Sequence, residues 1–297
     1  MDGPLTRMLT QKEFLVLDGA MGTELQRRGV DTGLPLWSAN ALMVHPETVL
    51  QIHQEYITAG ADIITTNTFR TTRRTFRRAR LPDRSRQLAA QAVKLAQRAR
   101  DAFPEREILI AGSIAPLEDC YRPDLVPAEQ NLLEEHTELA RRLAEAGVDF
   151  ILVETMNMIR EAYTACQAAK TTGKEVVVSF ICDQGGNLYG GEPLDLAVRT
   201  LSELQPTAFS LNCVSPRYLK RPLQTLRTAT TLPCAVYANV GVPGNTNGEW
   251  EFTLDILEDE YARYAREWRH GGASVIGGCC GTTPEYIRRI SQAMAQM

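Results

Sequence analysis

Short apolar runs alternate along this chain with longer segments of helical period. Eight such runs, rich in β-branched residues, cover residues 14–17, 62–66, 108–112, 150–154, 176–181, 208–212, 234–238 and 274–278. They are apolar throughout instead of alternating with polar residues, which is typical of parallel strands buried on both faces. Between them, segments such as 46–59, 130–146 and 257–270 repeat apolar residues at helical spacing and predict amphipathic helices.

Three glycines mark the junctions between these segments. Gly60, Gly147 and Gly272 each stand where a predicted helix ends and a strand begins, a common position for glycine after a helix. Eight strand–helix units predict an α/β protein built as one (β/α)8 TIM barrel, with residues 1–297 forming a single domain. A doubly wound open sheet is the alternative.

Polar side chains follow these strands, at the end where barrel enzymes carry their chemistry. The residues just past the apolar runs are Asp18, Thr66, Asn67, Ser113, Glu154, Cys182, Asp183, Cys213, Asn239, Cys279 and Cys280. We therefore expect thiols and carboxylates from distant parts of the chain to meet at one mouth of the barrel.

The adjacent cysteines after the last strand indicate a metal site. Glycines flank Cys279 and Cys280, and in a closed barrel one strand separates this pair from Cys213 after the sixth strand. Zinc accepts thiolates at about 2.3 Å in a tetrahedron, and catalytic zinc sites leave one position open. Cys182 also ends a strand, but we expect it to pack as a buried residue, because three thiols already account for the site. No histidine ends a strand, since the histidines fall on predicted helices or at their starts: His45, His53, His136 and His270. The sequence thus predicts one Zn²⁺ per chain at the C-terminal mouth, open to a further ligand.

The remaining cysteines are expected to be small buried hydrophobic residues: Cys120, Cys166, Cys182 and Cys234. A disulfide between Cys279 and Cys280 would be strained, since neighbouring Cα atoms lie about 3.8 Å apart. We interpret such a disulfide as an oxidised, inactive form.

Composition and charge narrow the class of protein, its partners and its cellular compartment. The chain has 297 residues, 44% hydrophobic and 23% charged, which is ordinary for a globular protein. Its formal net charge of −4 gives no reason to expect nucleic acid as a partner. No segment is apolar enough for a signal peptide or a membrane span. Seven cysteines without a disulfide-framework spacing favour the reducing cytoplasm.

The strand-end motifs resemble those of a known family, the homocysteine S-methyltransferases. This family includes betaine- and S-methylmethionine-using enzymes and the homocysteine-binding module of cobalamin-dependent methionine synthase. The resemblance covers nearly the whole chain, and its matching motifs are Leu17-Asp18-Gly19-Ala20-Met21-Gly22-Thr23, Thr66-Asn67-Thr68-Phe69, Glu154-Thr155-Met156, Asn212-Cys213 and Gly277-Gly278-Cys279-Cys280-Gly281-Thr282.

The resemblance implies an activity and roles for individual residues. It implies that Cys213, Cys279 and Cys280 bind zinc, and that Asp18 and Glu154 lie near the amino group of homocysteine. We expect Asn239, which ends the seventh strand, to contact substrate as well. The implied reaction moves a methyl group from an activated donor to the zinc-bound homocysteine thiolate and forms methionine.

The donor stays open: S-methylmethionine, S-adenosylmethionine, or a methylcorrinoid or methylfolate system on a partner protein. Betaine is disfavoured, because Arg70 stands near the position of a tyrosine that the betaine enzymes carry after the second strand.

Other interpretations remain at this stage. Asp18 could cap a turn and Glu154 could pair with a structural arginine. The chain could be a non-catalytic homocysteine- and zinc-binding module that serves a methyl carrier, or a barrel that binds a phosphorylated substrate at the last strand. Six arginines between residues 70 and 80 predict a solvated surface or a docking site for an anionic donor or corrinoid protein. The glycine-rich segment 183–192 predicts a lid or a surface turn.

Overall fold

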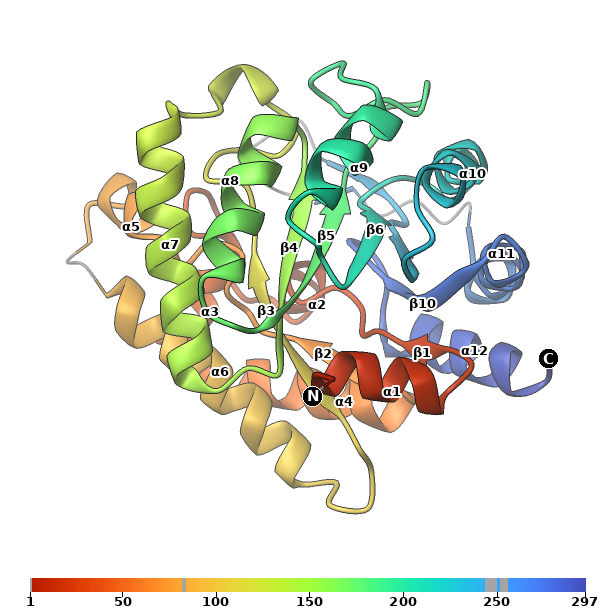
Figure 1. Cartoon of the computed structure of the whole chain (residues 1–297). Coiled ribbons are helices and arrows are strands. Elements are labelled where there is room, and N and C mark those ends of the chain that lie inside the picture. Colours follow the sequence, from red (N-terminus) through yellow and green to blue (C-terminus); the bar gives the residue numbers. More distant parts are fainter. Residues whose placement is uncertain (1, 82–83, 244–249, 252–255) are drawn as a thin grey trace.

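The computed structural model describes residues 2–81, 84–243, 250–251 and 256–297. Eight strands form one parallel sheet in the order β1-β10-β7-β6-β5-β4-β3-β2, with helices around its outside (Figure 1). The strands are β1 (Leu15–Val16), β2 (Ile63–Thr65), β3 (Leu109–Ile114), β4 (Phe150–Met156), β5 (Glu175–Phe180), β6 (Ala208–Asn212), β7 (Cys234–Ala238) and β10 (Ala273–Gly278).

The sheet closes on itself between its first and second strands. β1 pairs with β10 on one side, and a parallel bridge joins Leu17 to Ile63 on the other. The backbone N–H of Asp18 donates to the carbonyl of Ile63 at 2.9 Å. The predicted (β/α)8 barrel is therefore confirmed, and the open-sheet alternative is wrong.

The helices follow the strands as the apolar period predicts. The outer layer consists of α4 (Pro46–Ala59), α6 (Ser85–Asp101), α7 (Glu129–Ala146), α8 (Ile159–Lys170), α9 (Leu194–Ser202), α10 (Lys220–Ala229), α11 (Glu258–His270) and α12 (Pro284–Ala295). Shorter helices α2 (Gly22–Arg27), α3 (Ala41–Val44) and α5 (Arg73–Arg78) lie in the first two connections. Gly60, Gly147 and Gly272 all adopt positive φ, between 91° and 112°, as expected for glycines that end helices.

An N-terminal helix that we did not predict, α1 (Pro4–Gln11), closes one end of the barrel. Its residues Leu5 and Met8 are buried against side chains of the barrel interior, including Leu15 and Phe150. The carboxylate of Glu175, at the start of β5, accepts the backbone N–H groups of Leu5 at 2.7 Å and Thr6 at 2.9 Å. The N-terminal end is thus sealed, and access is left to the opposite end.

Several strand ends differ from the prediction, because the strands extend into the site. β3 continues to Ile114 and β4 to Met156, with a bulge between Val153 and Met156. A short hairpin, β8 (Val242–Pro243) with β9 (Trp250–Glu251), follows β7. Within the described ranges, no helix has the length and apolar character needed to cross a bilayer.

Candidate metal centre

Three thiols from two strands meet at the open end of the barrel. Cys213 follows β6 directly, and Cys279 and Cys280 follow β10. Their sulfur atoms all lie within 4.8 Å of one another. Cys213 is buried, whereas the other two are half-buried, so the cluster is reachable from the mouth. The structure thus brings together the three predicted metal ligands.

The turn that carries the cysteine pair depends on glycine. Gly281 has a φ of +86°, and a Cβ there would lie 1.5 Å from the carbonyl oxygen of Val240. The turn is fastened at Gly281, whose N–H donates to Thr23 Oγ1 at 2.9 Å. At Cys279, the N–H donates to Ala238 O at 2.8 Å, and the carbonyl accepts Thr282 Oγ1 at 2.7 Å. These contacts fix the backbone at Cys279 and Gly281, on both sides of Cys280.

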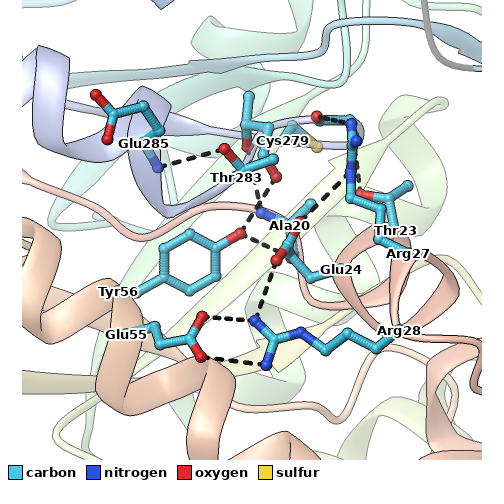
Figure 2. A network of polar contacts seen from close by, with 12 residues as sticks. Ala20, Thr23, Glu24, Arg27, Arg28, Glu55, Tyr56, Cys279, Thr283 and Glu285 are labelled. Carbon is cyan, nitrogen blue, oxygen red and sulfur yellow. Dashed lines mark hydrogen bonds and ion pairs between the residues drawn. The ribbon is translucent and has the colours of Figure 1, made fainter.

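A polar network supports this turn from behind (Figure 2). Tyr56 on α4 donates to Ala20 O at 2.9 Å, and Arg28 joins Glu24 on α2 to Glu55 on α4. On the far side, Thr283 caps α12 by accepting the N–H of Glu285. The turn is therefore held between α2, α4 and α12.

Asn212 positions the third thiol. Cys213 and Thr155 are both non-glycine residues with positive φ, 54° and 60°. The Asn212 Oδ1 accepts Thr155 N–H at 3.1 Å and the Ser179 hydroxyl at 2.7 Å. Its Nδ2 donates to Thr155 Oγ1 at 2.7 Å and to Cys213 Sγ at 3.4 Å. Asn212 is fully buried, so one amide holds two strained residues of the site in place.

Hydrogen bonds between the sulfurs shift the pKa values of Cys279 and Cys213 in opposite directions. The pKa of Cys279 is held well below its ordinary value, because Cys213 and Cys280 donate hydrogen bonds to its sulfur. The pKa of Cys213 is correspondingly raised by its hydrogen bond with Cys279. The cluster thus already favours a thiolate at Cys279, which is the form that binds metals.

Two buried carboxylates face this cluster. Asp18 accepts the Thr65 N–H at 2.7 Å and the Thr65 hydroxyl at 3.0 Å. Glu154 accepts hydrogen bonds from Ser113 and from Tyr237, the latter at 3.3 Å. Over the described ranges, neither carboxylate forms an ion pair with a lysine or arginine, so a structural arginine partner for Glu154 is wrong.

Burial shapes the titration of both acids. It raises the pKa of Glu154 to about 7, and the neighbouring Cys279 adds to the rise. It also raises the pKa of Asp18 well above its usual range, with a further contribution from Glu154. The two acids and Cys279 are thus close enough to interact, and a cation bound among them would favour their ionised forms.

Asn239 lies at the end of β7, where the sequence predicts it. The residue is 7% exposed, its backbone N–H donates to Val214 O, and its buried Oδ1 has no hydrogen-bond partner among the described residues. A contact with substrate stays a prediction. Sequence reasoning placed Ser113 at a strand end and Asn212 in a motif without giving either a role, and it missed Tyr237 as part of the site.

The other sequence features find structural roles. Cys120, Cys166, Cys182 and Cys234 are buried, as expected. The arginines after β2 are not simply solvated: Arg74 and Arg78 pair with the buried Glu118, and Arg73 pairs with acids on α7. The segment 183–192 is a folded turn in which bridges join Cys182 to Leu188 and Asn187 to Pro193.

A closed (β/α)8 barrel with three cysteines converging at its open end defines a class of barrel enzymes whose thiol cluster can hold a metal ion. Residues 15–294 match the family model described as homocysteine S-methyltransferase. The chain belongs to the homocysteine S-methyltransferase family, and it is a methyltransferase.

Similar proteins agree over their whole lengths. The homocysteine S-methyltransferase YbgG of Bacillus subtilis is 32% identical, with 97% of this chain and 96% of that protein covered. The selenocysteine methyltransferase of Astragalus bisulcatus is 28% identical over 94% of this chain and 92% of its own. The crystal structure of the homocysteine methyltransferase MmuM from Escherichia coli, metallated form, has a TM-score of 0.86 at 30% identity, covering 97% of this chain and 99% of that one.

Proposed function

We propose that this protein transfers a methyl group from an activated donor to the sulfur of homocysteine and forms methionine, with Cys213, Cys279 and Cys280 holding one Zn²⁺. The observation that carries the proposal is the convergence of three sulfur atoms within 4.8 Å at the open end of the barrel. Family membership supplies the acceptor, because relatives across nearly the full length are named for homocysteine.

The donor set suits zinc. Three thiolates at about 2.3 Å from one tetrahedral ion lie about 3.8 Å from each other, within the spread of the cluster. Over the described ranges, no fourth cysteine, histidine or acid joins the three sulfurs, so one coordination position is left for a substrate atom. A zinc ion held by these three cysteines would lower the pKa of a further coordinated thiol, and so would supply a thiolate nucleophile near neutral pH.

The carboxylates supply orientation. Asp18 and Glu154 are both buried and lack a cationic side-chain partner among the described residues, so a substrate ammonium group between them would stabilise the ionised forms that burial disfavours. Placing this ammonium fixes the direction of the substrate chain and brings its sulfur toward the cysteines. Methyl transfer then breaks the donor's bond to the methyl carbon, and that electron pair stays on the donor while the acceptor sulfur forms the new bond.

The rival phosphate site has little support at the same turn. Phosphate binding in barrels uses free backbone N–H groups. Here the N–H groups of Gly278, Cys279, Gly281 and Thr282 donate to Asp18 O, Ala238 O, Thr23 Oγ1 and Cys279 O respectively. Four amides around the turn are thus already used.

A metal and activity test on matched cysteine variants decides the proposal. Zinc content and methionine formation are measured for wild type, Cys213→Ser and Cys166→Ser, the last a buried cysteine of α8 outside the cluster. We expect about one zinc per chain and turnover in wild type and Cys166→Ser, and the loss of both in Cys213→Ser. Full zinc and full turnover in Cys213→Ser would contradict the assignment. Homocysteine binding without turnover on any donor would favour a non-catalytic module that serves a corrinoid or methylfolate partner. The proposed setting is the cytoplasm.

A further inference from the structure

The carboxyl end of β4 contains a β-bulge. Three steps along β4, from Val153 to Met156, lie opposite two steps along β5, so β4 holds one extra residue here. The irregularity falls at Thr155, whose φ is +60°. Bulges are common beside functional sites, where the extra residue redirects a side chain.

The bulge changes the direction of the side chains that follow it. Phe150 and Leu152 pack in the barrel interior, and an unbroken strand would also direct Met156 inward, because residues two apart share a face. Met156 instead packs in the outer core, which includes side chains of the helices. The extra residue therefore lets two consecutive side chains face the site: Glu154 accepts hydrogen bonds from β3 and β7, and Thr155 bonds to β6.

Thr155 is strained and fully buried. Among the non-glycine residues with positive φ that the structure describes, only Thr155 is β-branched, and branching at Cβ makes this conformation most unfavourable. Such strain persists only where neighbouring contacts enforce it, and it is typical of functional sites. Asn212 provides these contacts, since its Oδ1 accepts the Thr155 N–H at 3.1 Å and its Nδ2 donates to Thr155 Oγ1 at 2.7 Å. The bulge therefore depends on the strand that precedes Cys213.

The same contacts join Glu154 to the thiol cluster. Asn212 Nδ2 lies 3.4 Å from Cys213 Sγ, and Thr155 Oγ1 lies 4.0 Å from that sulfur. Thr155 also follows Glu154 directly, so its backbone fixes the direction in which that carboxylate leaves β4. One buried residue thus contacts the support of a predicted metal ligand and orients a predicted substrate ligand.

We infer that Thr155 is a positioning residue that couples two parts of the site, the amino-group subsite at Glu154 and the metal subsite at Cys213. The inference rests on the proposed function. The Thr155 hydroxyl keeps Asn212 in the orientation that supports Cys213, and the strained Thr155 backbone holds Glu154 toward the acceptor. Loss of the hydroxyl should therefore weaken the binding of the amino group and of the metal together.

Two thiols isolate the effect on Glu154. Homocysteine and 4-mercaptobutanoate share a carbon chain, a thiol and a carboxylate, but only homocysteine has an amino group. Calorimetry on zinc-saturated protein compares their Kd values in wild type, in Thr155→Val, which lacks the hydroxyl, and in Thr155→Ser, which keeps it. We expect Thr155→Val to bind homocysteine about 10-fold more weakly and 4-mercaptobutanoate less than about 2-fold more weakly, and Thr155→Ser to bind both as wild type does.

Two further measurements show whether Thr155 acts through its neighbours. In a Glu154→Gln background, Thr155→Val should weaken homocysteine binding by less than about 2-fold more, because the group that it positions is already lost. In the ligand-free protein, Thr155→Val should weaken zinc binding about 10-fold, measured by competition with a chelator, and Thr155→Ser should restore it. Ser210→Ala, which removes another fully buried hydroxyl, on β6, is the control and should change neither Kd.

Three results would overturn the inference while leaving methyl transfer intact: equal weakening of both thiols, an undiminished effect in the Glu154→Gln background, or unchanged zinc affinity in Thr155→Val. So would a Thr155→Ser variant that binds homocysteine about 10-fold more weakly, and this variant decides the test if Thr155→Val does not fold. Absence of homocysteine binding and turnover in zinc-replete wild type would overturn the proposed function, and the inference with it.

Discussion

Removal of the Asn212 amide is expected to damage both the fold and the metal centre. In Asn212→Ala, the buried Thr155 N–H and Ser179 hydroxyl lose their acceptor, and Cys213 loses the donor at 3.4 Å from its sulfur. Each unpaired buried polar group costs about 1–3 kcal/mol, and partial relaxation lowers the sum, so we expect a loss of roughly 3 kcal/mol.

This loss of unfolding free energy corresponds to a measurable fall in Tm. At about 2.1 cal/mol/K per residue over 297 residues, 3 kcal/mol lowers Tm by about 5 °C. Because Asn212 also orients Cys213, we expect zinc to bind about 10- to 100-fold more weakly, as for other residues that orient metal ligands. Calorimetry of the zinc-free protein measures the first effect, and competition with a chromophoric chelator measures the second.

Asn131→Ala is the matched control, since Asn131 is exposed on α7. We expect this variant to melt within about 1 °C of wild type. The reasoning fails if zinc-free Asn212→Ala melts as wild type does and binds zinc with the same affinity, because the positive φ of Cys213 would then need no support from the amide.

The two remaining predictions concern pH and the cysteine turn. Burial raises the pKa of Glu154 from 4.5 to about 7, so as pH rises this carboxyl ionises in the unfolded chain before it does in the folded protein. Glu154 therefore lowers the free energy of unfolding as pH rises from about 4.5 to 7, by about 3 kcal/mol above pH 7. Glu154→Gln should flatten that fall in the zinc-free protein, whereas substitution of the exposed Glu145 on α7 by Gln should not. Identical Tm–pH curves for Glu154→Gln and wild type would refute this prediction. Gly281→Ala should lose zinc and lower Tm by several degrees, because the added Cβ would overlap Val240 O. Gly173→Ala is the control, since Gly173 also has a positive φ but open space around it, and this variant should keep its zinc. Intact zinc in both variants would contradict the steric argument.

The barrel was predictable because its signal is local. Apolar runs of parallel strands and helix-ending glycines such as Gly60 and Gly147 are visible in short windows of sequence. The bulge in β4 was not predictable, because the positive φ of Thr155 depends on Asn212, 57 residues away. The single-domain organisation stays a prediction.

The candidate site was likewise predictable only in part. The sequence identifies the thiols and acids at strand ends by residue type and position, but it does not identify the residues that support them. Tyr237 occurs inside an apolar strand, so nothing in the local sequence indicates that its hydroxyl reaches Glu154, which ends a different strand. The arginines after β2 were misread as mainly solvated, because their buried partner Glu118 follows a different strand.

Under the proposed function, the charged groups of the ligand-free site complement the charges of the metal ion and the substrates. Three close sulfurs share protons that a dication would displace, and two buried acids with raised pKa have no cationic partner among the described residues. A Zn²⁺ held by the three cysteine thiolates would carry a formal charge of −1, and a substrate thiolate at the open position would bring it to −2 and stay electron-rich. In this proposal Asp18 and Glu154 receive the substrate ammonium group, which would favour the orientation that points the substrate sulfur toward the cysteines. The same negative centre would attract a positively charged methyl donor, so the charge that activates the acceptor would also favour the approach of such a donor.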